Sequence, residues 1–175
     1  MKYVTLLVLI LGFNLSANAC SIFGAQLFEP TLKYWNQHPG PAQINQDEDG
    51  DYWEPVPLPV VSEIEIERAT YGGNNSCEDA GIISLTVSLP DASTYDIDEF
   101  GVYFHVIDGD LPDLIFPNIP LKGTVKESNM YFVFPWLDQR PKLQNPLDIT
   151  IEVRFVTNGL DLGTASVVKI RQIDS

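Results

Sequence analysis

DITIEVRFVT, at residues 148–157, is the stretch that decides the fold, because apolar and polar residues alternate along it. Successive side chains of a β-strand point to opposite faces, so a period of two indicates a strand with one buried face. The side chains that this alternation turns inward are Ile149, Ile151, Val153 and Phe155, and those that it turns outward are Thr150, Glu152, Arg154 and Val156.

The same period recurs in earlier parts of the chain. VVSEIEIERA, at residues 60–69, places glutamates on one face and isoleucines on the other. IISLTVSL, at residues 82–89, alternates apolar residues with serine and threonine, and FGVYFHVI, at residues 100–107, keeps one face apolar. NMYFVF, at residues 129–134, reads as a further short strand. Each of these segments is therefore predicted to be a β-strand.

Two further segments bring the total to about seven short strands. LIFPNIPLKG, at residues 114–123, contains two prolines that lack a backbone donor, so we expect it to run along a sheet edge. The turn NGLDLG, at residues 158–163, leads into residues 164–173 and predicts a terminal hairpin. Residues 60–175 are thus predicted to form one all-β domain, an antiparallel sandwich.

Three of these segments resemble a fibronectin type III module. SLTVSLPDA (residues 84–92) is similar to its second strand, EFGVYFHVIDG (99–109) to its third, and ITIEVRFVTNGLDLGTAS (149–166) to its sixth strand and the start of its seventh. Leu89 stands where the module has a core tryptophan, and Ile149 where it usually has a tyrosine. The resemblance implies an immunoglobulin-like sandwich used for adhesion, spacing or binding, with no family-wide catalytic residues.

Residues 1–19 carry the features of a secretory signal peptide. One lysine precedes an apolar run, and the segment ends in Ala17, Asn18 and Ala19, an A-x-A cleavage signal. The run of about ten apolar residues is half of what a membrane-spanning helix needs, and no later segment is long or apolar enough to span. We therefore expect the segment to be removed and the protein to be secreted or periplasmic.

Cys20 and Cys77 are the two cysteines of the chain. In an oxidising compartment they are expected to form a disulfide that joins the mature N-terminus to the domain. The alternative is a lipid anchor on Cys20, although Ala17 stands where a bacterial lipobox prefers leucine.

Residues 20–59 are predicted to be a proline-rich, acidic extension without regular structure. Within it, NQDEDGDYWE at residues 45–54 has the spacing of the first half of an EF-hand calcium loop, but Val56 stands where the closing glutamate should be. The alternative is a solvated acidic turn. The candidate calcium ligands are Asn45, Asp47, Asp49, Asp51 and Glu54.

Trp35, Trp53 and Trp136 lie in polar, proline-rich surroundings and are candidate binding residues. Exposed rings could stack on sugars or anchor a protein partner. The alternative is that they fold back and cover the sandwich.

The sequence contains no G-x-S-x-G motif and no serine placed beside a candidate base, so we expect a protein without enzymatic activity. The formal net charge of −14 disfavours nucleic acid and anionic lipid as partners. The first hypothesis is therefore an exported protein for protein binding, adhesion or structural support. A calcium-dependent or aromatic-platform carbohydrate-binding module is the alternative, and a hydrolase with a dispersed carboxylate pair is a third hypothesis.

Overall fold

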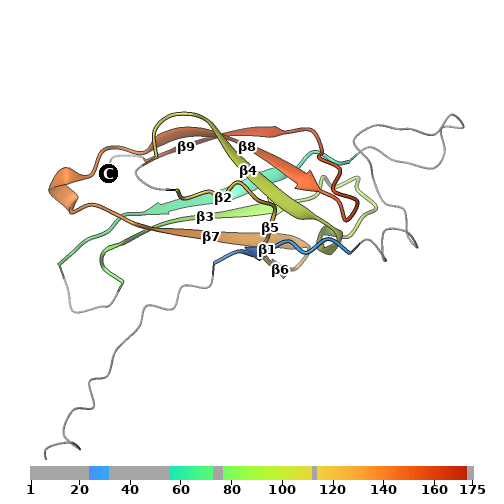
Figure 1. Ribbon diagram of the computed structural model, residues 1–175, viewed down its shortest axis with the longest axis horizontal. Helices are drawn as coiled ribbons and strands as arrows, with labels where there is room; N and C mark the ends of the chain where they lie inside the picture. Colours follow the sequence, from blue (N-terminus) through green and yellow to red (C-terminus); the bar gives the residue numbers. More distant parts are fainter. Residues whose placement is uncertain (1–23, 32–55, 73–76, 112–113, 173–175) are drawn as a thin grey trace, which may run out of the picture.

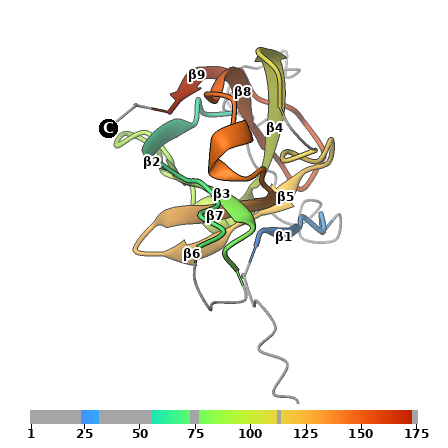
Figure 2. The ribbon, with the colours of Figure 1, turned by 90° about the vertical axis from the view of Figure 1, so that its left-hand side faces the viewer.

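Two antiparallel β-sheets form the described part of the chain, which comprises residues 24–31, 56–72, 77–111 and 114–172 of the computed structural model. The strand order is β1-β5-β4-β8-β9 in one sheet and β2-β3-β7-β6 in the other. Figure 2 views the two layers from one end, with β4 and β8 in one layer and β6 and β7 in the other. The predicted all-β, antiparallel two-sheet fold is confirmed.

The five-stranded sheet consists of β1 (Gln26–Leu27), β5 (Leu121–Lys122), β4 (Gly101–Asp108), β8 (Asp148–Val156) and β9 (Ser166–Arg171). The four-stranded sheet consists of β2 (Val60–Glu67), β3 (Ala80–Ser88), β7 (Asn129–Leu137) and β6 (Thr124–Lys126). Two short 3₁₀ turns, η1 (Ile97–Glu99) and η2 (Pro141–Leu143), lie at opposite ends of the sandwich (Figure 1).

Seven of the described strands lie in the segments that the sequence predicts as strands: β2, β3, β4, β5, β7, β8 and β9. The additional strands, β1 and β6, have two and three residues. An alternation cannot be recognised over so few residues, which is why the sequence did not predict them.

The prediction that residues 114–123 run along a sheet edge was wrong. Only Leu121 and Lys122 form a strand there, and this strand, β5, lies between β1 and β4. The prolines come before β5 and do not interrupt it, so its backbone can pair on both sides. Gln26 pairs with Lys122 and Leu27 with Leu121, so part of the predicted extension covers this strand.

The inward face predicted for β8 is confirmed, since its four apolar side chains are fully buried. Val156, predicted to point outward, is also buried, at 2% exposure. The chain folds back over it, because Val156 forms a β-bridge with Leu162 and the Gly163 amide donates to the Phe155 carbonyl at 3.0 Å. A loop that returns over its own strand can thus bury a residue on the outward side.

Aromatic rings join the two layers at the centre of the core. The ring of Phe104, on β4, lies 4.9 Å from that of Phe132 and 5.1 Å from that of Phe134, both on β7. Both contacts are edge-to-face, a favoured geometry for aromatic pairs. Apolar burial between the sheets therefore provides the main stabilisation of the fold.

Candidate functional site

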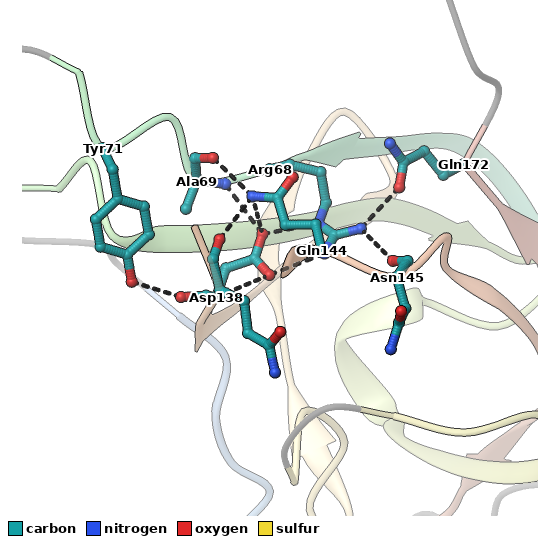
Figure 3. Close-up of polar contacts among 8 residues, drawn as sticks. Arg68, Ala69, Tyr71, Asp138, Gln144, Asn145 and Gln172 are labelled. Carbon is teal, nitrogen blue, oxygen red and sulfur yellow. Dashed lines mark hydrogen bonds and ion pairs between the residues drawn. The ribbon is translucent and has the colours of Figure 1, made fainter. Parts of the chain in front are cut away.

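Polar groups from both sheets meet at the end of the sandwich that carries η2 (Figure 1). Arg68 follows β2 and Asp138 follows β7, and both strands belong to the four-stranded sheet. Asn145 precedes β8 and Gln172 follows β9 in the five-stranded sheet. Figure 3 shows these residues converging on the Arg68 guanidinium.

Arg68 and Asp138 form a two-pronged ion pair. Arg68 Nε donates to Asp138 Oδ2 at 2.7 Å, and Nη2 donates to Oδ1 at 2.9 Å. The remaining nitrogen, Nη1, donates to the Asn145 carbonyl at 2.9 Å and to Gln172 Oε1 at 2.7 Å. The planar guanidinium therefore links the ends of both sheets in one fixed geometry.

The Asp138 side chain has 0% exposure, and every contact on it favours the carboxylate. The Ala69 amide donates to Oδ2 at 3.0 Å, and the Gln139 amide donates to Oδ1 at 2.8 Å. Burial alone would raise the pKa of Asp138, but the hydrogen bonds from Arg68, Ala69 and Gln139 outweigh it and hold the pKa below the ordinary value. Asp138 is therefore a charged, structural group.

Gln144 fixes the loop that follows β7. Its Nε2 donates to the Ala69 carbonyl at 2.7 Å and to the Gln139 carbonyl at 2.8 Å. Within the same loop, the Leu143 amide donates to the Arg140 carbonyl at 2.7 Å. Residues 138–147 are thus held from both sides, which gives this loop a defined shape.

Tyr71 adopts a left-handed backbone conformation, with φ of 53°. This conformation is rare for a bulky residue and persists only where contacts enforce it. Here the hydroxyl donates to the Asp138 carbonyl at 2.6 Å, and the amide donates to the Glu78 carbonyl at 3.1 Å. The Arg140 guanidinium lies 5.9 Å from the ring centre, a cation–π contact.

The loop and Tyr71 present an exposed surface with apolar and positive side chains. Leu137 is 68% exposed, Leu143 65% and Tyr71 40%, and Arg140 and Lys142 are also exposed. We call this set the end surface, and its members are Tyr71, Leu137, Arg140, Lys142 and Leu143. Tyrosine and arginine are enriched among the residues that dominate protein interfaces, so their presence beside exposed leucines makes this a candidate interaction surface.

Trp136 does not have the exposed ring that a binding platform needs. It lies on β7, not in a loop, and is 5% exposed. Its ring packs against Gly81, where an added Cβ would lie 2.2 Å from the indole Cζ2, and under Arg68 at 6.0 Å. The apolar alternation of β7 continues through Pro135 and turns Trp136 inward, and this pattern could have been recognised in the sequence.

The other predicted site residues are not brought to the end surface by the described structure. Trp35, Trp53, Cys20 and the candidate calcium ligands Asn45, Asp47, Asp49, Asp51 and Glu54 lie outside the described residues. Cys77 is described, but its predicted pairing with Cys20 stays a prediction. The Arg68–Asp138 network was missed, because no local sequence pattern marks partners that are 70 residues apart.

The described ranges contain neither a metal-binding cluster nor a membrane-spanning helix. Within them, no three His, Cys, Asp or Glu side chains gather closely enough to hold a metal ion. The helices of this part of the chain include none with the length and apolar character needed to cross a membrane.

A cavity of about 930 Å³ lies at the other end of the sandwich, beside η1. Its lining includes Leu27, Phe28 and the acidic residues Glu29, Asp98 and Glu99. Lys122 Nζ pairs with Asp98 Oδ1 at 3.0 Å, which partly neutralises this lining. None of the described residues that line the cavity is a cysteine or a histidine.

No protein-family model, curated protein or solved structure matches the chain. The described residues define an all-β protein of two antiparallel sheets, and its function has to be argued from its own surface.

Asp138→Asn is expected to destabilise the protein by about 3 kcal/mol, because it leaves Arg68 buried without its counter-charge. This corresponds to a fall in Tm of about 6–12 °C. Asp148→Asn is the matched control, since Asp148 pairs with Arg171 and Lys169 at the exposed surface and should matter much less. Thermal unfolding followed by circular dichroism measures both, and equal shifts would contradict a special role for Asp138.

Lowering the pH should remove the contribution that Asp138 makes to the free energy of unfolding. Its folded-state pKa lies below the ordinary value, so its stabilisation is present above the unfolded-state pKa and is lost as the pH falls through the folded-state pKa. The gap in free energy of unfolding between wild type and Asp138→Asn should therefore narrow between about pH 5 and pH 2. Urea unfolding at a series of pH values tests this, and a gap that stays constant down to pH 2 would argue against it.

Proposed function

We propose that this protein is an exported, non-enzymatic, immunoglobulin-like β-sandwich that binds another extracytoplasmic protein through its end surface. The observation that carries the proposal is the exposure of Leu137, the last residue of β7, and of Leu143, in the following loop that the Arg68–Asp138 pair holds. A surface that is already rigid loses little conformational entropy on binding, so its apolar contacts convert more fully into affinity.

The order of the strands supports the immunoglobulin-like assignment. In that fold, the strands named A, B, E and D form one sheet, and C, F and G form the other. Lettered from β2, the order β2-β3-β7-β6 corresponds to A-B-E-D, and β4-β8-β9 corresponds to C-F-G. In this assignment β5 is an additional strand beside C.

Export is supported by the sequence of residues 1–19 and by the cysteine pair Cys20 and Cys77. The proposal places the protein in a periplasm or outside the cell. A lipid anchor on Cys20 would keep the same sandwich at a membrane surface and would leave the end surface available.

Binding to a protein is favoured over binding to carbohydrate. An aromatic platform for sugars needs rings with an open face. Trp136, the one tryptophan of the described residues, is buried, and the exposed ring of Tyr71 has the Arg140 guanidinium over it. The end surface instead offers branched apolar side chains beside cations, which suit a polypeptide partner.

Leu143→Asp is expected to weaken binding to the native partner at least about tenfold, because it places a charge at an apolar contact. Leu143 is exposed, so the stability of the free protein should change by less than about 0.5 kcal/mol. Crosslinking in the native host, followed by affinity purification and quantitative mass spectrometry, compares partner recovery.

Leu58→Asp is the matched control. Leu58 is also an exposed leucine outside a strand, but it lies before the start of β2, at the other end of that strand from Arg68. Partner recovery should stay near wild type for Leu58→Asp. Undiminished recovery with Leu143→Asp would refute the role of the end surface.

A further inference from the structure

Two cations on the end surface take part in no ion pair. Among the basic residues of the described ranges, five form ion pairs with carboxylates: Arg68, Lys122, Arg154, Lys169 and Arg171. Lys126, Arg140 and Lys142, all described, form none. Two of these three, Arg140 and Lys142, lie in the loop after β7 and are separated by Pro141.

The carboxylates that flank this loop in the sequence are already engaged. Asp138 is buried against Arg68, and Asp148 pairs with Lys169 at 3.1 Å and with Arg171 at 2.8 Å. Glu78 and Asp79 adjoin the surface through their carbonyls, which accept from the Tyr71 and Asp138 amides, so two acidic residues border it there. The loop itself still presents a local excess of positive charge on a chain with 24 acidic and 10 basic residues.

Contacts within the protein hold Arg140 in place. Its guanidinium lies over the Tyr71 ring at 5.9 Å, and its carbonyl accepts the Leu143 amide. Tyr71 is fixed in turn by its hydroxyl bond to the Asp138 carbonyl. The position of this cation beside Leu143 is therefore set before any partner arrives, which favours specific recognition of a carboxylate.

We propose that the end surface recognises an acidic polypeptide segment that carries at least one large apolar side chain. This inference rests on the proposed function and specifies its partner. The apolar side chain packs against Leu137 and Leu143, and the carboxylates of the segment pair with Arg140 and Lys142. Complementary charge here steers association and selects the partner.

A polypeptide segment fits this surface better than an anionic bilayer does. A segment can contact the two cations and leave the rest of the molecule in water. A bilayer is an extended plane of negative charge that would also face the surrounding acidic surface of a chain with a net charge of −14. Two unpaired cations are few for membrane binding, since each contributes only about 1 kcal/mol.

A phage-displayed library of random dodecapeptides, selected on the exported protein, tests the inference. The enriched peptides should be acidic and should contain a large apolar residue. Their affinities are then measured by fluorescence polarisation for wild type and for the charge reversal Arg140→Glu with Lys142→Glu. The reversal should weaken binding by about tenfold or more, because it replaces two attractive pairs with repulsive ones.

Lys126→Glu is the matched control, since Lys126 is an exposed lysine on β6 without an ion pair. It should change the affinity by less than about twofold. The unfolding curve of Lys126→Glu should match wild type, and that of the charge reversal should lie close to it, because the reversal removes only the exposed contact of Arg140 with the Tyr71 ring.

The outcomes separate this inference from the proposed function. Neutral or basic enriched peptides, no enrichment, or equal binding to the charge-reversed variant would overturn the acidic partner. If peptides lose affinity for Leu143→Asp but not for the charge reversal, the binding surface stands and the inference fails. If both variants bind as well as wild type, both proposals fail. Co-flotation with phosphatidylglycerol vesicles that depends on Arg140 and Lys142 would assign the surface to a membrane instead.

Discussion

The ion pair between Arg68 and Asp138 is the interaction on which the shape of the end surface depends. The Arg68 guanidinium pairs with Asp138 at the end of the four-stranded sheet and reaches Asn145 and Gln172 at the end of the five-stranded sheet. Burying an ion pair is costly because both charges lose water, and the loss is offset only where all the polar atoms find partners. Here the carboxylate also accepts from the Ala69 and Gln139 amides, so the pair is well satisfied.

The core and this network have different roles. Contacts such as Phe104 with Phe132 hold the two sheets together, but they are apolar and tolerate some repacking. The ion pair is directional, so it determines the path of residues 138–147 rather than the existence of the sandwich. The exposed Leu143 and Arg140 belong to this loop, so the ion pair fixes their positions. For this reason we propose that binding occurs at this end of the molecule.

Much of the fold could be predicted from the sequence, because a period of two fixes which face of a strand is buried. The inward residues of β8 follow directly from it. The position of β5 could not be predicted, since its partner β1 lies nearly 100 residues earlier in the chain and has only two residues. Two alternatives were open for Trp136, an exposed binding residue or a ring that covers the sandwich. Its burial agrees with the second, and the alternation of β7, which continues into it, could have decided between them.

The Arg68–Asp138 network and the end surface could not be predicted from the sequence. Arg68 and Asp138 look like ordinary surface charges where they stand in the chain, and only the fold shows that they are partners. Trp136, which lies two residues before the loop of residues 138–147, was nevertheless named as a candidate binding residue. In the structure Trp136 is buried, and the exposed apolar side chains at this end of the sandwich are those of Leu137 and Leu143.

Amide hydrogen exchange in Asp138→Asn, measured by NMR, tests most directly whether the ion pair shapes the loop. In wild type the Leu143 amide, which donates to the Arg140 carbonyl, should be protected. In the variant it should exchange near the rate of an unstructured chain, while core amides such as Ile151 on β8 keep clear protection. A Leu143 amide that remains as protected in the variant as in wild type would contradict the account.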